Sequence, residues 1–163
     1  MKEVAILLLL AVMLNGCGSS TAVESPSASV WQSVMAGGEG TSSGFLFNTQ
    51  FTVSSGGALT IVSFQLLNTG TCYGGVGPTP TGTLNVTYNS ADQISGMFSF
   101  TILSSAGDTI TLTSSSVTGT ANVNNSNLLS GVTIIGTWAL VPGSGSSCVA
   151  ASGSFTMTQT NAT

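Results

Sequence analysis

Apolar and polar side chains alternate along most of the chain from Val30 onward, a period typical of β-strands with one buried face. In FLFNTQFTV, for example, Phe45, Phe47, Phe51 and Val53 fall on one face. The same alternation groups further residues on single faces of predicted strands: Leu84, Val86 and Tyr88; Phe98, Phe100 and Ile102; Ile110 and Leu112; Val117, Gly119, Ala121 and Val123; Ile134, Gly136, Trp138 and Leu140; Phe155 and Met157. We expect these faces to form one apolar interior.

Two segments depart from simple alternation. In LTIVSFQLLN, Leu59 and Ile61 fall on one face, whereas Val62, Phe64 and Leu66 fall on the other. Either both faces of this strand are covered, or a β-bulge near Ile61–Val62 resets the register. The stretch VWQSVMAGG fits one short helical turn or an edge strand equally well.

Turn-forming residues separate the predicted strands at intervals of about ten residues, the spacing of a β-meander. Ser55-Gly56-Gly57 and Ala106-Gly107-Asp108 are two of these turns. We therefore expect an all-β fold, an antiparallel meander of about eight or nine strands arranged as a barrel or a sandwich. The outer faces carry Thr, Ser and Asn, and such neutral edges aggregate unless the sheet closes or is covered. This argument mildly favours a closed barrel.

Three small residues, Gly119, Ala121 and Gly136, fall on the inward faces of predicted strands. Two interpretations are open: tight packing against large neighbours, or room for a ligand inside the barrel. Packing is the commoner use of small residues at such positions.

Charged residues make up 4% of the 163 residues, whereas a typical soluble domain contains about 25%. Lys2 is the one basic residue, and the chain contains no histidine. From Cys17 onward the chain contains no cationic side chain and cannot neutralise phosphates, so we expect no nucleic-acid partner. The same lack argues against electrostatic attraction to anionic lipid headgroups.

The chain begins with an apolar run that ends in a cysteine. Val4–Leu14 has about the length of the hydrophobic region of a signal peptide and is too short to span a bilayer. The sequence Leu14-Asn15-Gly16-Cys17 resembles the lipobox of bacterial lipoproteins, in which an aliphatic, a variable and a small residue precede the cysteine. Asn15 is less usual at its place than Ala, Ser or Thr. The alternative is a plain secretory signal with a chance cysteine.

The resemblance covers the N-terminal segment and implies a lipid anchor. In this family the cysteine thiol is joined to diacylglycerol, the chain is cut just before it, and the new N-terminus is acylated, for example with palmitate. Gly18, rather than Asp, follows Cys17, which implies the outer membrane of the bacterial envelope. The expected organisation is a signal peptide at 1–16, a lipidated cysteine and flexible tether at 17–29, and a single β domain at 30–163. The later stretch GTW…C…GSFTMT is similar in style to small bacterial lipoproteins of uncharacterised function.

With Cys17 acylated, Cys72 and Cys148 remain as an even pair. An exported chain enters an oxidising compartment, so we expect a disulfide between them. Closing a loop of about 75 residues would stabilise the fold by about 4 kcal/mol in the chain-entropy model. A metal or redox pair is the alternative, which the lack of a CxxC motif and of histidine disfavours.

Reactive side chains are scarce. Without histidine, no Ser-His-Asp or Cys-His arrangement is available. The acids after Cys17 are Glu24, Glu39, Asp92 and Asp108, and the last two lie in predicted turns, where Asp usually accepts hydrogen bonds from the backbone. We expect no catalytic activity, no metal site and no cofactor.

Trp31 and Trp138 remain as weak candidates for ligand binding, because an exposed Trp ring can stack on a sugar. Trp138 lies on an inward face, which favours packing in the core. The sequence thus predicts a non-catalytic, lipid-anchored envelope lipoprotein with a structural or interaction role. The alternative is a β-barrel that binds a small apolar or sugar ligand. The identity of any protein or small-molecule partner stays open, apart from the membrane reached through the lipid.

Overall fold

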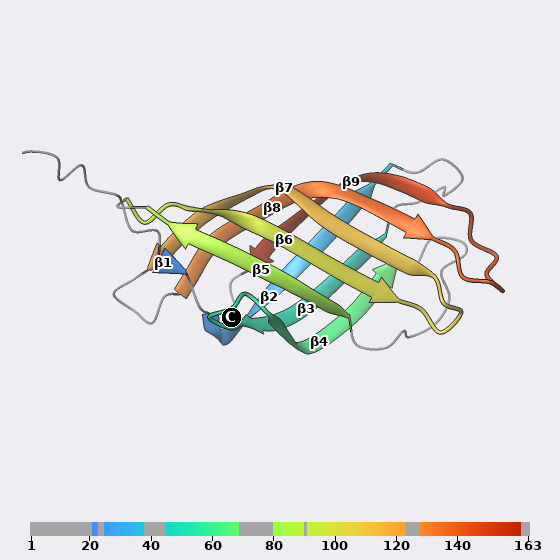
Figure 1. The fold of residues 1–163 in the computed structure, drawn as a ribbon, viewed down its shortest axis with the longest axis horizontal. Coiled ribbons are helices and arrows are strands. Elements are labelled where there is room, and N and C mark those ends of the chain that lie inside the picture. The colour runs from blue at the N-terminus through green and yellow to red at the C-terminus, as the bar shows by residue number, and fades with distance from the viewer. Residues whose placement is uncertain are drawn as a thin grey trace, which may run out of the picture.

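The computed structural model describes residues 21–22, 25–37, 45–68, 80–89, 91–122 and 128–160. Every regular element that these residues form is a β-strand (Figure 1). The strands are β1 (Thr21–Ala22), β2 (Ser25–Ala36), β3 (Leu46–Val53), β4 (Leu59–Asn68), β5 (Thr81–Tyr88), β6 (Ile94–Leu103), β7 (Thr109–Asn122), β8 (Leu128–Val141) and β9 (Ala151–Thr160).

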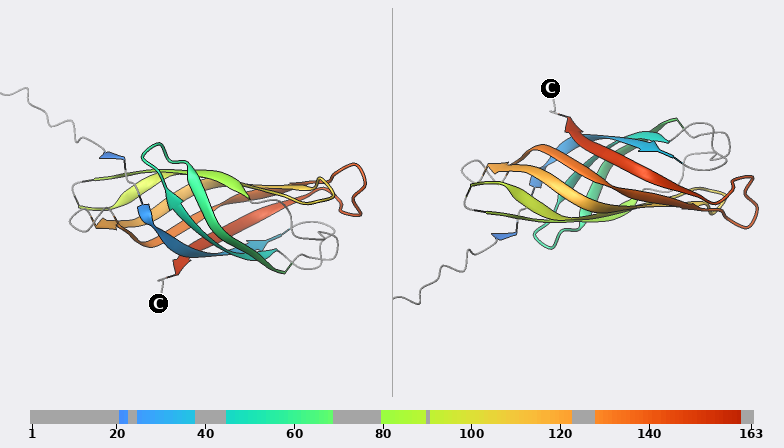
Figure 2. Two further views of the ribbon diagram at one scale, coloured as in Figure 1. Left: turned by 90° about the horizontal axis from the view of Figure 1, so that it is seen from below. Right: turned by 90° about the horizontal axis from the view of Figure 1, so that it is seen from above.

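The strands form one antiparallel sheet in the order β1-β5-β6-β7-β8-β9-β2-β3-β4. Strands β5 to β9 and β2 to β4 each follow one another as a meander, and pairing of β2 with β9 joins the two runs. The sheet curls into a half-barrel, as the two views of Figure 2 show. Its two long edges approach each other where Ala58, just before β4, bridges Thr83 of β5. The predicted all-β meander is therefore confirmed, with one curled sheet in place of a sandwich.

One face of each long strand lines a single hydrophobic core. Tyr88 and Gly119 are half-buried, and Val123 lies outside the described residues. The other residues that alternation groups together are buried: Phe45, Phe47, Phe51, Val53, Leu84, Val86, Phe98, Phe100, Ile102, Ile110, Leu112, Val117, Ala121, Ile134, Gly136, Trp138, Leu140, Phe155 and Met157. The predicted faces are thus confirmed for the described strands.

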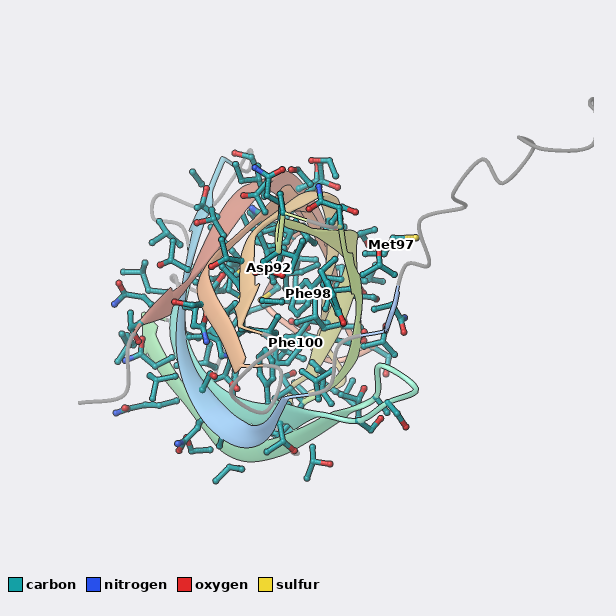
Figure 3. All side chains as sticks on the ribbon, turned by 90° about the vertical axis from the view of Figure 1, so that its left-hand side faces the viewer. Asp92, Met97, Phe98 and Phe100 are labelled. Carbon is teal, nitrogen blue, oxygen red and sulfur yellow. The ribbon has the colours of Figure 1, made fainter. Side chains whose placement is uncertain are left out.

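Aromatic rings fill the middle of the half-barrel. Phe100 of β6 stacks on Phe47 of β3, with ring centroids 5.6 Å apart, and on Phe98 at 5.8 Å. Phe98 in turn contacts Phe155 of β9 at 6.2 Å. Figure 3 shows Phe98 and Phe100 directed into the interior, whereas Met97 of the same strand points outward. The contacts of Phe100 with Phe47 and of Phe98 with Phe155 join β6 to β3 and β9, which are not its neighbours in the sheet.

A β-bulge explains the irregular pattern of β4. Gln50 of β3 pairs with Ser63, whereas the next residue, Phe51, pairs with Ile61. Val62 is therefore the extra residue, and its side chain is 58% exposed. The bulge lets Ile61, Phe64 and Leu66 pack against the core from the same strand. Of the two interpretations of this segment, the β-bulge is confirmed.

A second bulge joins two stretches that the sequence presents as separate strands. The register of β7 against β8 shifts between Ser114 and Ser116, so Ser115 is the extra residue. This shift allows Leu112 and Val117 to face the core on one continuous strand. The alternation of apolar and polar residues is interrupted at the bulge, but β7 continues through it as one strand.

β2 is a strand rather than a helical turn, and it lies inside the sheet between β3 and β9. Trp31, Ser33 and Met35 alternate inward and are buried. The prediction of an edge strand for this segment is therefore wrong, because β9, from the other end of the chain, pairs with the edge of β2 that β3 leaves open.

Strand pairing begins ahead of Val30, where the sequence analysis places the start of the β domain. In β1, Thr21 lies opposite Tyr88 and Ala22 lies opposite Thr87 of β5. β2 starts at Ser25 and not at Val30. The segment expected to act as a tether thus contributes backbone to two strands.

Candidate functional site

The structure describes one of the three cysteines. Cys148 lies in the connection between β8 and β9, and its side chain is 8% exposed. Its backbone N–H donates a hydrogen bond to Oγ of Ser146 at 2.9 Å. Cys17 and Cys72 lie outside the described residues. Lipidation of Cys17 and pairing of Cys72 with Cys148 therefore stay predictions.

Asp108 has a buried carboxylate, 1% exposed, that joins two connections at one end of the half-barrel. Its Oδ1 accepts a hydrogen bond from the N–H of Gly143 at 2.9 Å, and its Oδ2 accepts one from Oγ of Ser104 at 3.0 Å. The Ser146 side chain also hydrogen-bonds to it. The turn between β6 and β7 is thereby tied to the loop that contains Cys148. The predicted role of Asp108 as a backbone acceptor in a turn is confirmed.

The surroundings of Asp108 keep it ionised. Burial raises the pKa of the carboxyl, but hydrogen bonds from Ser146, the backbone of Gly143 and Ser104 outweigh burial and hold the pKa below its usual 3.8. A general acid at neutral pH needs a raised pKa instead. Asp108 is therefore suited to hold loops together and not to donate protons.

We expect acid to weaken the fold through Asp108. Since the pKa of its carboxyl is lower in the folded state than the 3.8 of an unperturbed Asp, its contribution to the free energy of unfolding is complete above that pH. The contribution is lost as the pH falls through the folded-state pKa. Asp108→Asn should therefore lower the urea midpoint near neutral pH, and the deficit should shrink in acid. Urea unfolding over a series of pH values measures both effects.

Ser105→Ala is the matched control, because Ser105 is exposed in the same turn. Its urea midpoint should follow that of the wild type at every pH. A deficit of Asp108→Asn that stays constant from neutral to acid pH would contradict the role given to the carboxylate.

The other described acid, Asp92, lies beyond the opposite end of β6. The ten residues of β6 span about 33 Å, so the two carboxylates cannot act on one substrate bond. Asp92 is exposed and has a φ of 58°, and its carbonyl accepts a hydrogen bond from the N–H of Ala121 at 2.8 Å. Glu24 and Glu39 lie outside the described residues. In the part of the chain that the structure describes, no three His, Cys, Asp or Glu residues gather as a metal site.

Both tryptophans are buried, each 1% exposed. Nε1 of Trp138 donates to the carbonyl of Ala36 at 3.2 Å, and its ring meets that of Phe45 edge-on at 5.6 Å. Trp31 stacks on Phe51 at 5.0 Å. Neither ring presents a face to solvent on which a sugar could stack.

The small inward residues make room for neighbouring groups of the protein. A Cβ at Gly136 would lie 2.7 Å from Cε1 of Phe155 and would collide with the carbonyl oxygen of Thr113. A Cβ at Gly119, where φ is 150°, would lie 2.9 Å from Cα of Val132. Ala121 is buried in the core cluster. The geometry at these positions favours packing over space for a ligand.

A polar side chain that sequence reasoning missed, Gln159, joins three strands near the end of β9. Its Nε2 donates to Oγ of Ser29 at 2.9 Å and to the carbonyl of Leu129 at 2.8 Å. Its Oε1 accepts from the N–H of Val132 at 3.3 Å. The one indication of this role in the sequence is that Gln159 falls on the same face of β9 as the buried Phe155 and Met157. These bonds satisfy backbone groups where β7 and β8 change register.

A groove of about 350 Å³ lies between the turn that precedes β4 and the surface of β5 and β6. Its lining includes Ser55, Asn85, Thr87, Ser95 and Met97, and the Met97 side chain is 72% exposed. None of its lining residues carries a charge. Alternation predicts that Met97 points outward, but the groove exists because a distant turn approaches β5. It presents amide, hydroxyl and thioether groups and can contact a neutral molecule.

Comparison with known proteins identifies no relative: no family model, no curated protein and no solved structure matches the chain. Among the described residues, no helix has the length and apolar character needed to cross a membrane. The function is therefore inferred from the sequence and the geometry.

Proposed function

We propose that this protein is a non-catalytic, lipid-anchored lipoprotein of the bacterial cell envelope, with a structural or interaction role at the outer membrane. The observation that carries the proposal is the sequence Leu14-Asn15-Gly16-Cys17 at the end of a short apolar run. Acylation at Cys17 would hold the β domain on a membrane, because two or more acyl chains give stable attachment where one does not.

The geometry of the described domain supports a non-catalytic role. The two described acids lie at opposite ends of β6, and Asp108 is occupied by hydrogen bonds from Ser104 and Gly143. Aromatic rings fill the interior between β3, β6 and β9. Such an arrangement is typical of a rigid domain that presents a surface.

A second candidate is the binding of a small apolar or sugar molecule. The groove beside Met97 favours it, because its volume of about 350 Å³ is within the range of small-molecule sites and its lining is neutral. It ranks second because four of its nine lining residues, Met97 among them, are exposed, whereas a typical ligand site buries most of its ligand.

We also propose a disulfide between Cys72 and Cys148. The strand register places the end of β4 and the start of β9 at the same end of the half-barrel. Cys148 lies just before β9, and the connection that contains Cys72 starts from the end of β4. Burial of Cys148, and the common end of the half-barrel at which β4 ends and β9 starts, support the pairing.

Cys17→Ala should remove essentially all of the protein from the membrane fraction, because no acyl chain can then be attached. Fractionation of expressing bacteria, followed by immunoblotting, measures the change. Gly18→Asp is the matched control, since it keeps Cys17 and should stay in membranes while moving to the inner-membrane fraction. Continued membrane retention of Cys17→Ala would contradict the proposed anchor.

The intact mass of the protein extracted from membranes tests both modifications at once. We expect a chain that begins at Cys17 and carries a diacylglyceryl group and a further acyl chain. Its mass should also be that of the oxidised pair, two hydrogens below the dithiol. Two alkylatable thiols at Cys72 and Cys148 would rule out the disulfide and leave the anchor unaffected.

A further inference from the structure

β1 determines where the chain enters the half-barrel. β1 is antiparallel to β5, and Thr21 lies opposite Tyr88, the last residue of β5 (Figure 1). The chain therefore enters at the end that carries the turn at 89–93, which we name the Tyr88 end. The opposite end carries Asp108 and is named the Asp108 end.

The spacer between the proposed lipid and this strand is short. Three residues separate Cys17 from Thr21, and four extended steps span about 14 Å at most. The ten residues of β6 place the Asp108 end about 33 Å farther away. If Cys17 is lipidated, as the proposed function holds, the anchor lies beside the Tyr88 end.

The charges of the chain do not favour any other orientation of the half-barrel on a membrane than the one that the anchor gives. Lys2 is the one basic residue of the whole sequence, so no basic patch draws another face toward lipid headgroups. The Tyr88 end presents exposed Asn89 and Gln93, together with exposed Asp92. Nδ2 of Asn89 donates to Oε1 of Gln93 at 3.3 Å, and the remaining amide N–H groups of the two side chains can donate to headgroups. An acidic group disfavours anionic lipid, so this end fits a zwitterionic surface.

We propose that the half-barrel contacts a zwitterionic membrane surface through its Tyr88 end, with β1 as the strap that fixes this orientation. The Asp108 end, with the loop that contains Cys148, is directed away from the bilayer. That end, and not the groove or the Tyr88 end, is then the part most accessible to a protein partner.

Site-specific quenching tests the orientation. Lipidated protein purified from membranes is reconstituted in phosphatidylcholine vesicles that contain a lipid with a nitroxide on its headgroup. A fluorophore is attached through an azide-bearing amino acid at Ala91 in one sample and at Ser105 in the other. Both positions are exposed in turns that flank β6. We expect quenching several-fold stronger at position 91 than at position 105.

Inserting ten Gly and Ser residues between Ser20 and Thr21 provides the control. The insertion adds up to about 35 Å of reach and keeps both Cys17 and β1, so the contrast between the two positions should fall. Equal quenching in the original protein, or stronger quenching at position 105, would overturn the orientation and leave the anchor intact. A contrast that the insertion does not change would overturn the role given to the short spacer between Cys17 and β1. Failure of the purified protein to associate with vesicles would instead overturn lipidation, and the orientation with it.

Discussion

Phe100→Ala is expected to lower the free energy of unfolding by about 3–5 kcal/mol, the usual cost of removing a buried phenyl ring. The ring of Phe100 is 0% exposed and contacts Phe47 and Phe98 in the middle of the core. Its loss would leave a cavity among groups held in place by β3 and β6. Urea unfolding followed by circular dichroism measures the change.

Met97→Ala is the matched control on the same strand. Met97 points outward and is 72% exposed, so the substitution should change the free energy of unfolding by less than about 0.5 kcal/mol (Figure 3). A loss of less than about 1 kcal/mol for Phe100→Ala would mean that the core can collapse around the gap, contrary to the packing described.

Gly136→Ala is expected to destabilise the fold by about 1–3 kcal/mol or more, because one added methyl group overpacks this position. The new Cβ would collide with the carbonyl oxygen of Thr113 on β7 and press on Phe155 of β9. Phe155 has little room to move, since its ring already contacts Phe98. The midpoint of thermal or urea unfolding reports the loss.

Gly145→Ala provides the comparison. Gly145 is exposed in the connection between β8 and β9, and a Cβ there would meet no atom within 4 Å. We expect a change within about 0.5 kcal/mol. If Gly136→Ala were equally harmless, the interior would have space beside Phe155, and the ligand-binding alternative would gain support.

The faces of the strands were predictable because side chains alternate along any extended backbone. Phe98, Phe100 and Ile102 could be assigned to the interior without knowledge of their neighbours. Alternation did not indicate that β7 is one continuous strand, because the extra residue Ser115 reverses the pattern within it. In LTIVSFQLLN it left two explanations open, and the pairing of β4 with β3 decided between them.

The position of a strand in the sheet was harder to predict than its existence. The segment around Trp31 and Met35 reads as a strand, but its place between β3 and β9 depends on residues near the other end of the chain. Asp108 shows the same limit. Its turn was predictable, whereas the N–H of Gly143 that it binds lies 35 residues along the chain.

The sequence by itself determined the all-β class, the inward faces, the scarcity of reactive groups and the lipobox-like motif at Cys17. These features depend on local spacing and composition, and a linear motif such as that around Cys17 is independent of the fold that follows. The tertiary structure alone decided the curled single sheet, the bulge at Val62, the burial of Asp108 and the pairing of Thr21 with Tyr88. Each of these depends on which distant segments come into contact, and period-two alternation is the same for every antiparallel partner a strand could have.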